Sequence, residues 1–383
     1  MNTDPAHPQR LQRESSRIGY GLSIALSAIL GALCILLLTG RHQGSRSDPG
    51  TAVWPAMMVP VSQTGVVDDR GRFRQIFCAL DAEHGAQFSI QRPCNAALQR
   101  LSGEALPTTR PLPQPPPDRA KRFHIIIIPG MFGECVRSSA MPLEDAAAYM
   151  RAQGYRVDTI DVEGRSSSVR NAGIIARILP KMLKPGERLL IIGYSKGMSD
   201  ILETLALHGQ AIPAGSAIVS LAGIISGTPL ADHPADLDRM VSRIPMTNCG
   251  PGDGGAVKSV SRQHRIAWLA AHPLPVDRTY FSVAAFTDEA NISSPLKRTY
   301  SNLSKVDPRN DGQVLYTDAI VPGSHLLGYV NADHWAVALP FARKAPGLRR
   351  LFAGHNDYPR EILLEAIVRS VEDQLGPPDP ARH

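Results

Sequence analysis

The chain has 383 residues, of which 43% are hydrophobic and 20% are charged, so its composition is that of a globular protein and excludes a disordered one. Its 41 basic and 35 acidic residues leave a formal charge of +6 and form no basic block, which argues against a nucleic-acid partner. The five cysteines include no Cys-x-x-Cys pair, so the usual spacing of a structural zinc site is absent.

A membrane-spanning helix is the first predicted element, over the uncharged stretch from Ile18 to Gly40. About 20 apolar residues cross the core of a bilayer. A cleaved signal peptide is the alternative, but its apolar core is usually about 7–15 residues and ends at a small-residue site that this stretch lacks. We therefore expect one uncleaved anchor in the inner or plasma membrane, preceded by a cytoplasmic tail, residues 1–17.

The arginines on either side of this stretch predict its orientation. Three precede it and two follow it: Arg10, Arg13, Arg17, Arg41 and Arg46. Because positive charge accumulates on the cytoplasmic side, this small difference favours a cytoplasmic N-terminus. The rest of the chain is then expected on the non-cytoplasmic side, which is the periplasm in a bacterium.

Residues 41–120 are predicted to connect the anchor to a larger domain. Residues 41–106 comprise a linker and a small N-terminal unit with a strand over Arg72 to Leu80. The prolines of residues 107–120 favour extended backbone and predict a stiff stem.

The cysteines provide a second indication of the compartment. Cys78 and Cys94 lie close together in the small unit, so we expect them to form a disulfide in an oxidising environment. Cys135 and Cys249 are a weaker second pair, for which buried free thiols are a near-equal alternative.

Strand and helix signals alternate through residues 121–375, which we expect to form the main domain. The stretch Phe123 to Ile128 is rich in β-branched residues and predicts a strand buried on both faces, and the strands predicted in this domain number five. They are Phe123 to Ile128, Tyr155 to Val162, Leu189 to Ile192, Ser216 to Leu221 and Tyr280 to Phe286. Helical stretches over Leu143 to Gln153 and Ala172 to Leu183 lie between them. This order predicts an α/β fold with a mostly parallel central sheet and helices on both faces.

The sharpest motif is Gly193-Tyr194-Ser195-Lys196-Gly197, which follows a predicted strand and precedes an amphipathic helix. A Gly-x-Ser-x-Gly sequence is a weak signal alone, but this context is that of a nucleophile elbow. The strained turn exposes the serine oxygen, and the two glycines allow strand and helix to approach closely. We therefore predict that Ser195 is a nucleophile.

An oxyanion hole is the next requirement, because backbone N–H groups must face the charge that develops on a carbonyl oxygen. One donor is expected from Lys196, the residue after the nucleophile, and the other from the loop after an earlier strand. Pro129-Gly130-Met131-Phe132-Gly133 is such a loop, and Met131 is the predicted second donor.

The base and its orienting acid are predicted from chain order, since an acid and then a histidine follow the serine in this arrangement. His334 lies in the polar turn Asp333-His334-Trp335, and Asp311 lies in Asn310-Asp311-Gly312. These two residues are our prediction for the base and the acid. Three rivals stay open: His325 for the base, and Asp288 and Asp307 for the acid.

Together these segments resemble bacterial triacylglycerol lipases and related α/β-hydrolases over about residues 122–345. Besides the motifs above, Gly227-Thr228-Pro229-Leu230-Ala231-Asp232 matches them. The resemblance implies an α/β-hydrolase fold, Asp311 as the triad acid and His334 as the base. The chain departs from the lipase pattern where Pro129 and Tyr194 replace histidines and where Lys196 follows the serine.

The predicted function is hydrolysis of small-molecule or lipid esters through an acyl-enzyme, without a metal or organic cofactor. Residues 226–275 are expected as a cap insertion, with a plain surface excursion as the alternative. Two other readings of the chain stay open. The first is an acyltransferase or thioesterase on the same fold, and the second is a catalytically silent, membrane-tethered binding protein.

Overall fold

The computed structural model describes residues 65–90, 92–106, 110–114, 123–131, 133–136, 140–185, 187–232, 250–344 and 358–376. The chain divides into two compact units, and all of the described residues belong to the second, Met57–His383. The predicted tail and anchor, residues 1–40, lie outside the described residues. Within the described part of the chain, no helix has the length and apolar character needed to cross a membrane.

An eight-stranded sheet forms the centre of the fold, in the order β1-β8-β7-β6-β5-β3-β4, with β2 on β8 as well. All of the strand pairs are parallel except that of β2 with β8. The strands are β1 Val67–Asp68, β2 Leu98–Gln99, β3 His124–Ile128, β4 Arg156–Thr159, β5 Leu189–Tyr194, β6 Ala217–Leu221, β7 Thr279–Ala285 and β8 His325–Val330. The mostly parallel sheet is thus confirmed.

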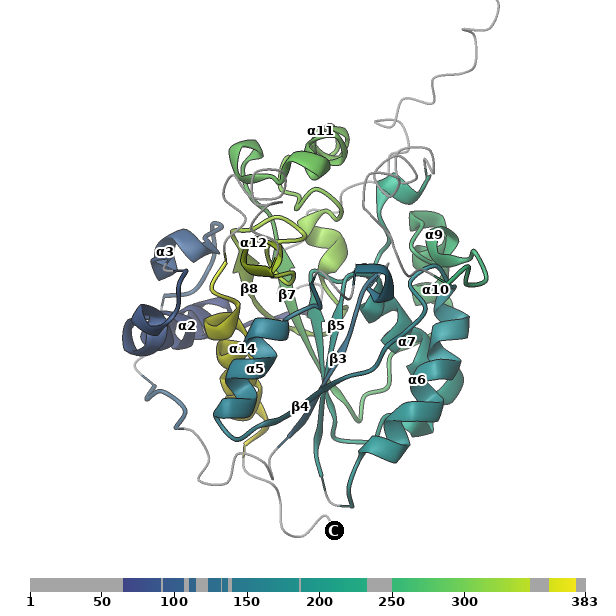
Figure 1. Ribbon diagram of the computed structural model, residues 1–383, viewed down its shortest axis with the longest axis horizontal. Helices are drawn as coiled ribbons and strands as arrows, with labels where there is room; N and C mark the ends of the chain where they lie inside the picture. Colours follow the sequence, from purple (N-terminus) through teal and green to yellow (C-terminus); the bar gives the residue numbers. More distant parts are fainter. Residues whose placement is uncertain are drawn as a thin grey trace, which may run out of the picture. The chain divides into compact units, whose positions relative to one another are not determined.

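Helices cover both faces of this sheet, with α2, α5 and α14 on one side and α6, α7 and α10 on the other (Figure 1). The helices are α2 Arg70–His84, α3 Cys94–Ala97, α5 Glu144–Ala152, α6 Ser168–Met182, α7 Lys196–His208, α9 Ala256–Ser259, α10 Arg262–Ala271, α11 Lys297–Ser304, α12 Phe341–Lys344 and α14 Arg360–Leu375. The 3-10 turns are η3 Gly85–Gln87, η4 Glu134–Val136, η5 Gly209–Ala211, η6 Pro229–Asp232, η7 Glu289–Asn291, η8 Ser294–Leu296 and η9 Tyr316–Ala319.

Alternate residues of the central strands pack into the two opposite layers, as the two-residue period of a strand requires. Ile125 and Ile127 belong to the hydrophobic cluster that includes α5 and α14, whereas Ile126 and Ile128 belong to the cluster that includes α6 and α7. Every residue of β3 is buried, which explains why its sequence reads as a continuous apolar run.

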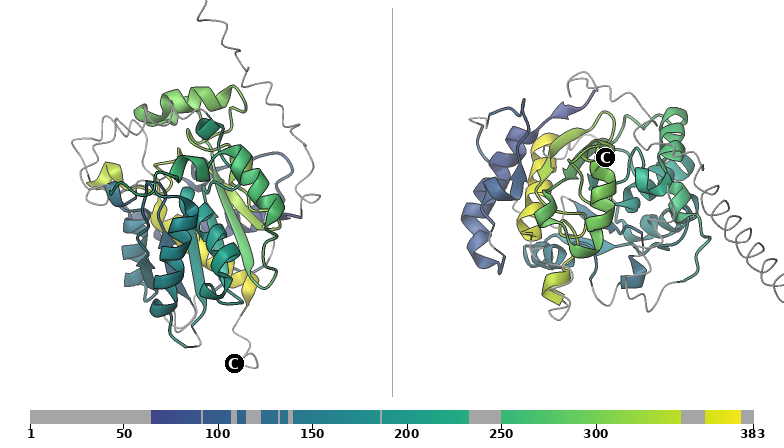
Figure 2. Two further views of the ribbon diagram at one scale, coloured as in Figure 1. Left: turned by 90° about the vertical axis from the view of Figure 1, so that its right-hand side faces the viewer. Right: turned by 90° about the horizontal axis from the view of Figure 1, so that it is seen from above.

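The strand predicted over Arg72 to Leu80 is wrong, because these residues lie within α2. Their buried apolar side chains are Phe73, Ile76, Phe77 and Leu80, a spacing that keeps them on one face of a helix. That face packs beside α14, so segments almost 300 positions apart in the chain lie side by side (Figure 2).

The predicted division between a small N-terminal unit and the main domain also needs correction. Strands β1 and β2 both pair with β8, so the described part of residues 41–106 completes the edge of the main sheet. A disulfide joins Cys78 to Cys94 and ties α2 to α3, which confirms that pairing. Cys135 is disulfide-bonded as well, and its predicted partner Cys249 lies outside the described residues.

The described part of the predicted stem, residues 110–114, lies against the domain instead of standing free. Arg72 on α2 donates hydrogen bonds to the carbonyl oxygens of Arg110 and Pro111, at 2.9 and 2.7 Å. Arg369 on α14 donates to the carbonyl oxygen of Pro113. Extended backbone leaves its carbonyl groups without internal partners, so they are available to these two arginines.

Candidate active site

Ser195 occupies the turn between β5 and α7, at the end of the sheet formed by the carboxyl ends of the parallel strands. Its backbone has φ 56° and ψ −130°, a strained conformation for a residue with a side chain. Only 4% of Ser195 is exposed to solvent. The predicted strand, elbow and helix are therefore present in this order, with the strain concentrated at the serine.

The glycines on either side of the serine are required by close backbone contacts. A Cβ atom on Gly193 would lie 2.5 Å from the Cα of Met198 in α7. A Cβ atom on Gly197 would lie 2.3 Å from the carbonyl oxygen of Ile128, at the end of β3. Both distances are below any ordinary contact, so the elbow closes only with glycine at these two positions.

The structure brings His334 and Asp311 to the serine, as the chain order predicted. His334 Nδ1 lies 2.7 Å from Asp311 Oδ2, and His334 Nε2 lies 2.8 Å from Ser195 Oγ. An ionised carboxylate can only accept, so Nδ1 carries the proton and Nε2 is free to accept one from the serine hydroxyl. The imidazole is thereby held in the tautomer that a general base requires.

Asp311 is itself fixed by its own turn. Its Oδ1 atom accepts hydrogen bonds from the backbone N–H groups of Gln313 and Val314, at 2.8 and 2.7 Å. The backbone carbonyl of Asp311 accepts from the N–H of His334 at 2.8 Å. Side chain and backbone of the acid therefore both hold the histidine.

The three rival residues lie elsewhere. His325 is at the start of β8, so it lies at the end of the sheet opposite to Ser195. There its Nδ1 lies 2.7 Å from Asp69 Oδ2. Asp307 accepts from Arg309, and Asp288 is exposed at the start of η7. None of the three contacts Ser195.

The predicted oxyanion loop lies directly against the nucleophile. A Cβ atom on Gly130 would come within 2.7 Å of the Ser195 Cβ and 3.1 Å of its Oγ. Lys196 opens α7, where first-turn N–H groups have no partner within the helix. In the described part of the chain, neither its N–H nor that of Met131 has a hydrogen-bond acceptor. Two unused donors thus come from the two segments that the prediction named.

A buried ion pair behind the elbow was missed from the sequence. The Nζ atom of Lys196 lies 2.6 Å from Asp200 Oδ1, and each side chain is only 1% exposed. The amide of Asn171 on α6 donates to the other carboxylate oxygen at 2.8 Å. The spacing of four residues on a helix could have indicated the pair, since such residues are neighbours on one face.

Of the segment predicted as a cap insertion, residues 226–275, the structure describes residues 226–232 and 250–275. The second half of this segment contains α10, whose Trp268 packs in the hydrophobic cluster with α6 and α7. Helix α10 therefore covers a face of the sheet as the connection between β6 and β7. Residues 233–249 of the predicted cap lie outside the described residues.

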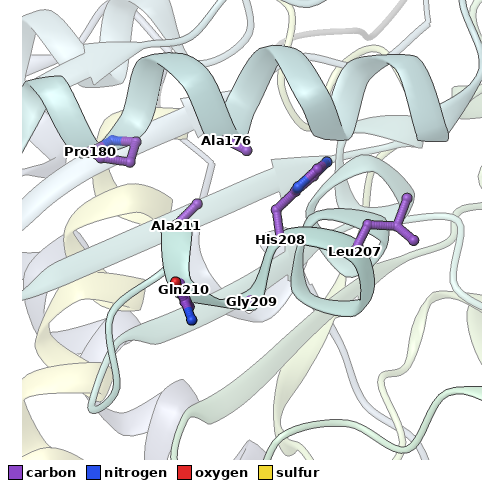
Figure 3. A pocket seen from close by; sticks show the side chains of 7 residues that line it. All are labelled: Ala176, Pro180, Leu207, His208, Gly209, Gln210 and Ala211. Carbon is purple, nitrogen blue, oxygen red and sulfur yellow. The ribbon is translucent and has the colours of Figure 1, made fainter.

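A pocket of about 600 Å³ lies away from this site, where α6 meets the end of α7 (Figure 3). Its lining is Ala176, Pro180, Leu207, His208, Gly209, Gln210 and Ala211. Since α7 begins beside Ser195 and rises about 1.5 Å per residue, roughly 18 Å separate the nucleophile from this pocket. It takes no part in the arrangement around Ser195.

Comparison with solved structures assigns the class of protein. The metagenomic carboxyl esterase MGS0156 is 39% identical, covers 85% of this chain and 98% of its own, and superposes with a TM-score of 0.76. The mature lipase BlEst2 of Bacillus licheniformis is 19% identical, over 63% of this chain and 95% of its own, with a TM-score of 0.47. No protein-family model and no curated protein matches the sequence.

The chain therefore belongs to the carboxyl esterases of the α/β-hydrolase fold. The likeness to MGS0156 carries this assignment, because it joins substantial identity to nearly complete coverage. The protein is a carboxylic ester hydrolase.

Proposed function

We propose that the protein hydrolyses esters through a triad of Ser195, His334 and Asp311, with a covalent acyl-enzyme intermediate. The observation that carries the proposal is the continuous hydrogen-bonded line from Asp311 Oδ2 through the imidazole to Ser195 Oγ, with links of 2.7 and 2.8 Å. Such a line is what a serine needs to become nucleophilic near neutral pH.

In the first half of the reaction, Ser195 Oγ attacks the ester carbonyl carbon while His334 Nε2 takes the hydroxyl proton. The tetrahedral intermediate collapses, the bond to the alcohol oxygen breaks, and His334 returns the proton to the leaving alcohol. In the second half, water attacks the acyl carbon and gives its proton to His334. The bond from the acyl carbon to Ser195 Oγ then breaks, His334 returns the proton to Ser195, and the carboxylic acid leaves. Asp311 keeps the imidazole in its tautomer and stabilises the imidazolium at both stages.

We further propose that the N–H groups of Met131 and Lys196 form the oxyanion hole. Both come from backbone segments that are in contact, and neither is used elsewhere among the described residues. Removing one donor of such a hole typically costs about 10²–10³ in kcat. Because the donors are backbone groups, replacing the histidines of the lipase pattern leaves the hole intact.

The triad is tested with Ser195→Ala, His334→Ala and Asp311→Asn, assayed on a water-soluble chromogenic ester and by labelling with a fluorophosphonate. Each variant should lose a factor on the order of 10⁴ in kcat, and pairs of changes should lose little more than one. His325→Ala is the matched control. His325 also lies 2.7 Å from an aspartate oxygen, but among the described residues its ring makes no hydrogen bond to a serine. Near-normal turnover by His334→Ala beside inactive His325→Ala would contradict the assignment.

We also propose that residues 18–40 anchor the enzyme in the inner or plasma membrane, with the catalytic domain on the periplasmic side. The support is the uncharged stretch, its flanking arginines and the disulfide between Cys78 and Cys94, a type of bond that persists mainly in oxidising compartments. An ester substrate would then be met outside the cytoplasm.

Two measurements on the full-length protein test the placement. Alkaline carbonate should leave it in the membrane pellet, and protease added outside spheroplasts should digest the catalytic domain. Extraction by carbonate would refute the anchor, and protection from the protease would reverse the orientation.

A further inference from the structure

The residue immediately before the nucleophile contacts the base. Tyr194 ends β5, and its hydroxyl donates a hydrogen bond of 2.6 Å to the backbone carbonyl of His334. The two rings also lie against each other, with centroids 5.2 Å apart and planes tilted by 31°. Both side chains are almost completely buried.

His334 is consequently held at four points by two residues. Asp311 binds the N–H and the Nδ1 of His334, and Tyr194 binds its carbonyl oxygen and faces its ring. Only Nε2 is left, and it faces Ser195 Oγ. Burial raises the pKa of Tyr194 well above its usual range, so its hydroxyl stays protonated and remains a donor.

We propose that Tyr194 is a positioning residue, which couples the strand carrying the nucleophile to the loop carrying the base. This inference rests on the proposed triad and extends it. Tyr194 and Ser195 are consecutive residues, so the hydrogen bond ties the His334 backbone to the same rigid strand end that fixes Ser195. A misplacement of about 1 Å between reacting groups can cost about 100-fold in rate, which is what this link prevents.

A purely structural role for Tyr194 is the competing explanation, because it also belongs to the hydrophobic core. Tyr358 provides a matched control. It is fully buried in the same cluster, and its hydroxyl donates a 3.0 Å hydrogen bond to the carbonyl oxygen of Ala97, which belongs to neither the elbow nor the proposed triad. Removing either hydroxyl deletes one buried hydrogen bond to a carbonyl, but only one of the two bonds holds the base.

The experiment compares Tyr194→Phe with Tyr358→Phe in the full-length enzyme. Both should lose similar thermal stability. Tyr194→Phe should lower kcat on the order of 10-fold with KM nearly unchanged, and should slow fluorophosphonate labelling in parallel, because alignment within the site has suffered. Tyr358→Phe should keep kcat. Tyr194→Leu, which also removes the ring, should lose more than Tyr194→Phe at a temperature where each variant is folded.

Two results would overturn the inference. The first is a Tyr194→Phe enzyme with unchanged kcat and labelling rate while His334→Ala is inactive; the triad would then stand without this positioning residue. The second is an equal loss of kcat in Tyr194→Phe and Tyr358→Phe, which would make the effect one of stability alone. Failure of the triad itself is recognised separately, by turnover that survives in His334→Ala.

Discussion

Replacing Gly197 with alanine tests whether the oxyanion loop and the nucleophile elbow depend on each other. The added Cβ atom would lie 2.3 Å from the carbonyl oxygen of Ile128 and 2.6 Å from that of Pro129. Carbon and oxygen atoms in contact are normally about 3.3 Å apart, so β3 and its loop must retreat by roughly 1 Å. Gly197 is not among the described glycines with positive φ, so the effect is steric alone.

That retreat moves the Met131 N–H away from the position of the oxyanion. We expect kcat to fall about 10²-fold, the usual cost of a misplacement of this size or of one lost oxyanion donor. Overpacking should also lower the free energy of unfolding by about 1–3 kcal/mol. The assays are kcat on a water-soluble ester and urea denaturation.

Gly173→Ala in α6 is the control, because nothing lies within 4 Å of a Cβ atom at that position. It should leave kcat unchanged and stabilise the protein by up to about 1 kcal/mol, the helix propensity difference between glycine and alanine. If Gly197→Ala behaved like Gly173→Ala, the contact between elbow and loop would not govern the oxyanion hole.

Three further changes test other features of the structure. Lys196→Met leaves Asp200 buried without its cation, so it should cost about 3–5 kcal/mol in urea denaturation; adding Asp200→Leu should recover most of the loss, and no recovery would argue against the ion pair. Replacing both Cys78 and Cys94 with serine opens a loop with a sequence separation of 16 residues, so it should cost about 3 kcal/mol with kcat retained; an unchanged urea midpoint would argue against the disulfide. Burial raises the pKa of Asp318 to about 6 despite Arg262, so its contribution to stability is full below about pH 4 and is lost as pH rises through 6. Between pH 4 and 7 the wild type should therefore lose up to about 3 kcal/mol of unfolding free energy that Asp318→Asn keeps. An equal pH dependence of the two proteins in urea denaturation would refute this.

Part of the site could be predicted because its signals are local. A nucleophile elbow is a strand, a tight turn and a helix in consecutive residues, and Gly193 is required by a close contact with Met198 within that short segment. The buried strands could be predicted for the same reason. Every residue of β3 is buried between two layers of helices, and four of its five residues are isoleucine. Turn geometry and hydrophobic periodicity can both be predicted from a single short segment, without knowledge of the rest of the chain.

The choice between rival acids and bases needed the tertiary structure. His325 begins β8 and His334 lies in the loop that follows this strand, and each side chain lies 2.7 Å from an aspartate oxygen. The two histidines can be told apart only in the folded sheet, where β5 and β8 run parallel. Ser195 follows the carboxyl end of β5, so only the histidine that follows the carboxyl end of β8 can reach it.

The same limit explains the errors and the omissions. The sequence predicts a strand where α2 lies, because the apolar face of this helix is short and its partner, α14, is at the other end of the chain. Tyr194 showed only as a departure from the lipase motif, since its hydrogen-bond acceptor on His334 is 140 positions away. The elbow, the buried strands and the order of the candidate groups along the chain could all be predicted from local sequence patterns. Which of these groups meet depends on long-range contacts in the folded sheet. Such contacts join segments far apart in the chain, and no local sequence pattern indicates which distant segment a residue will contact.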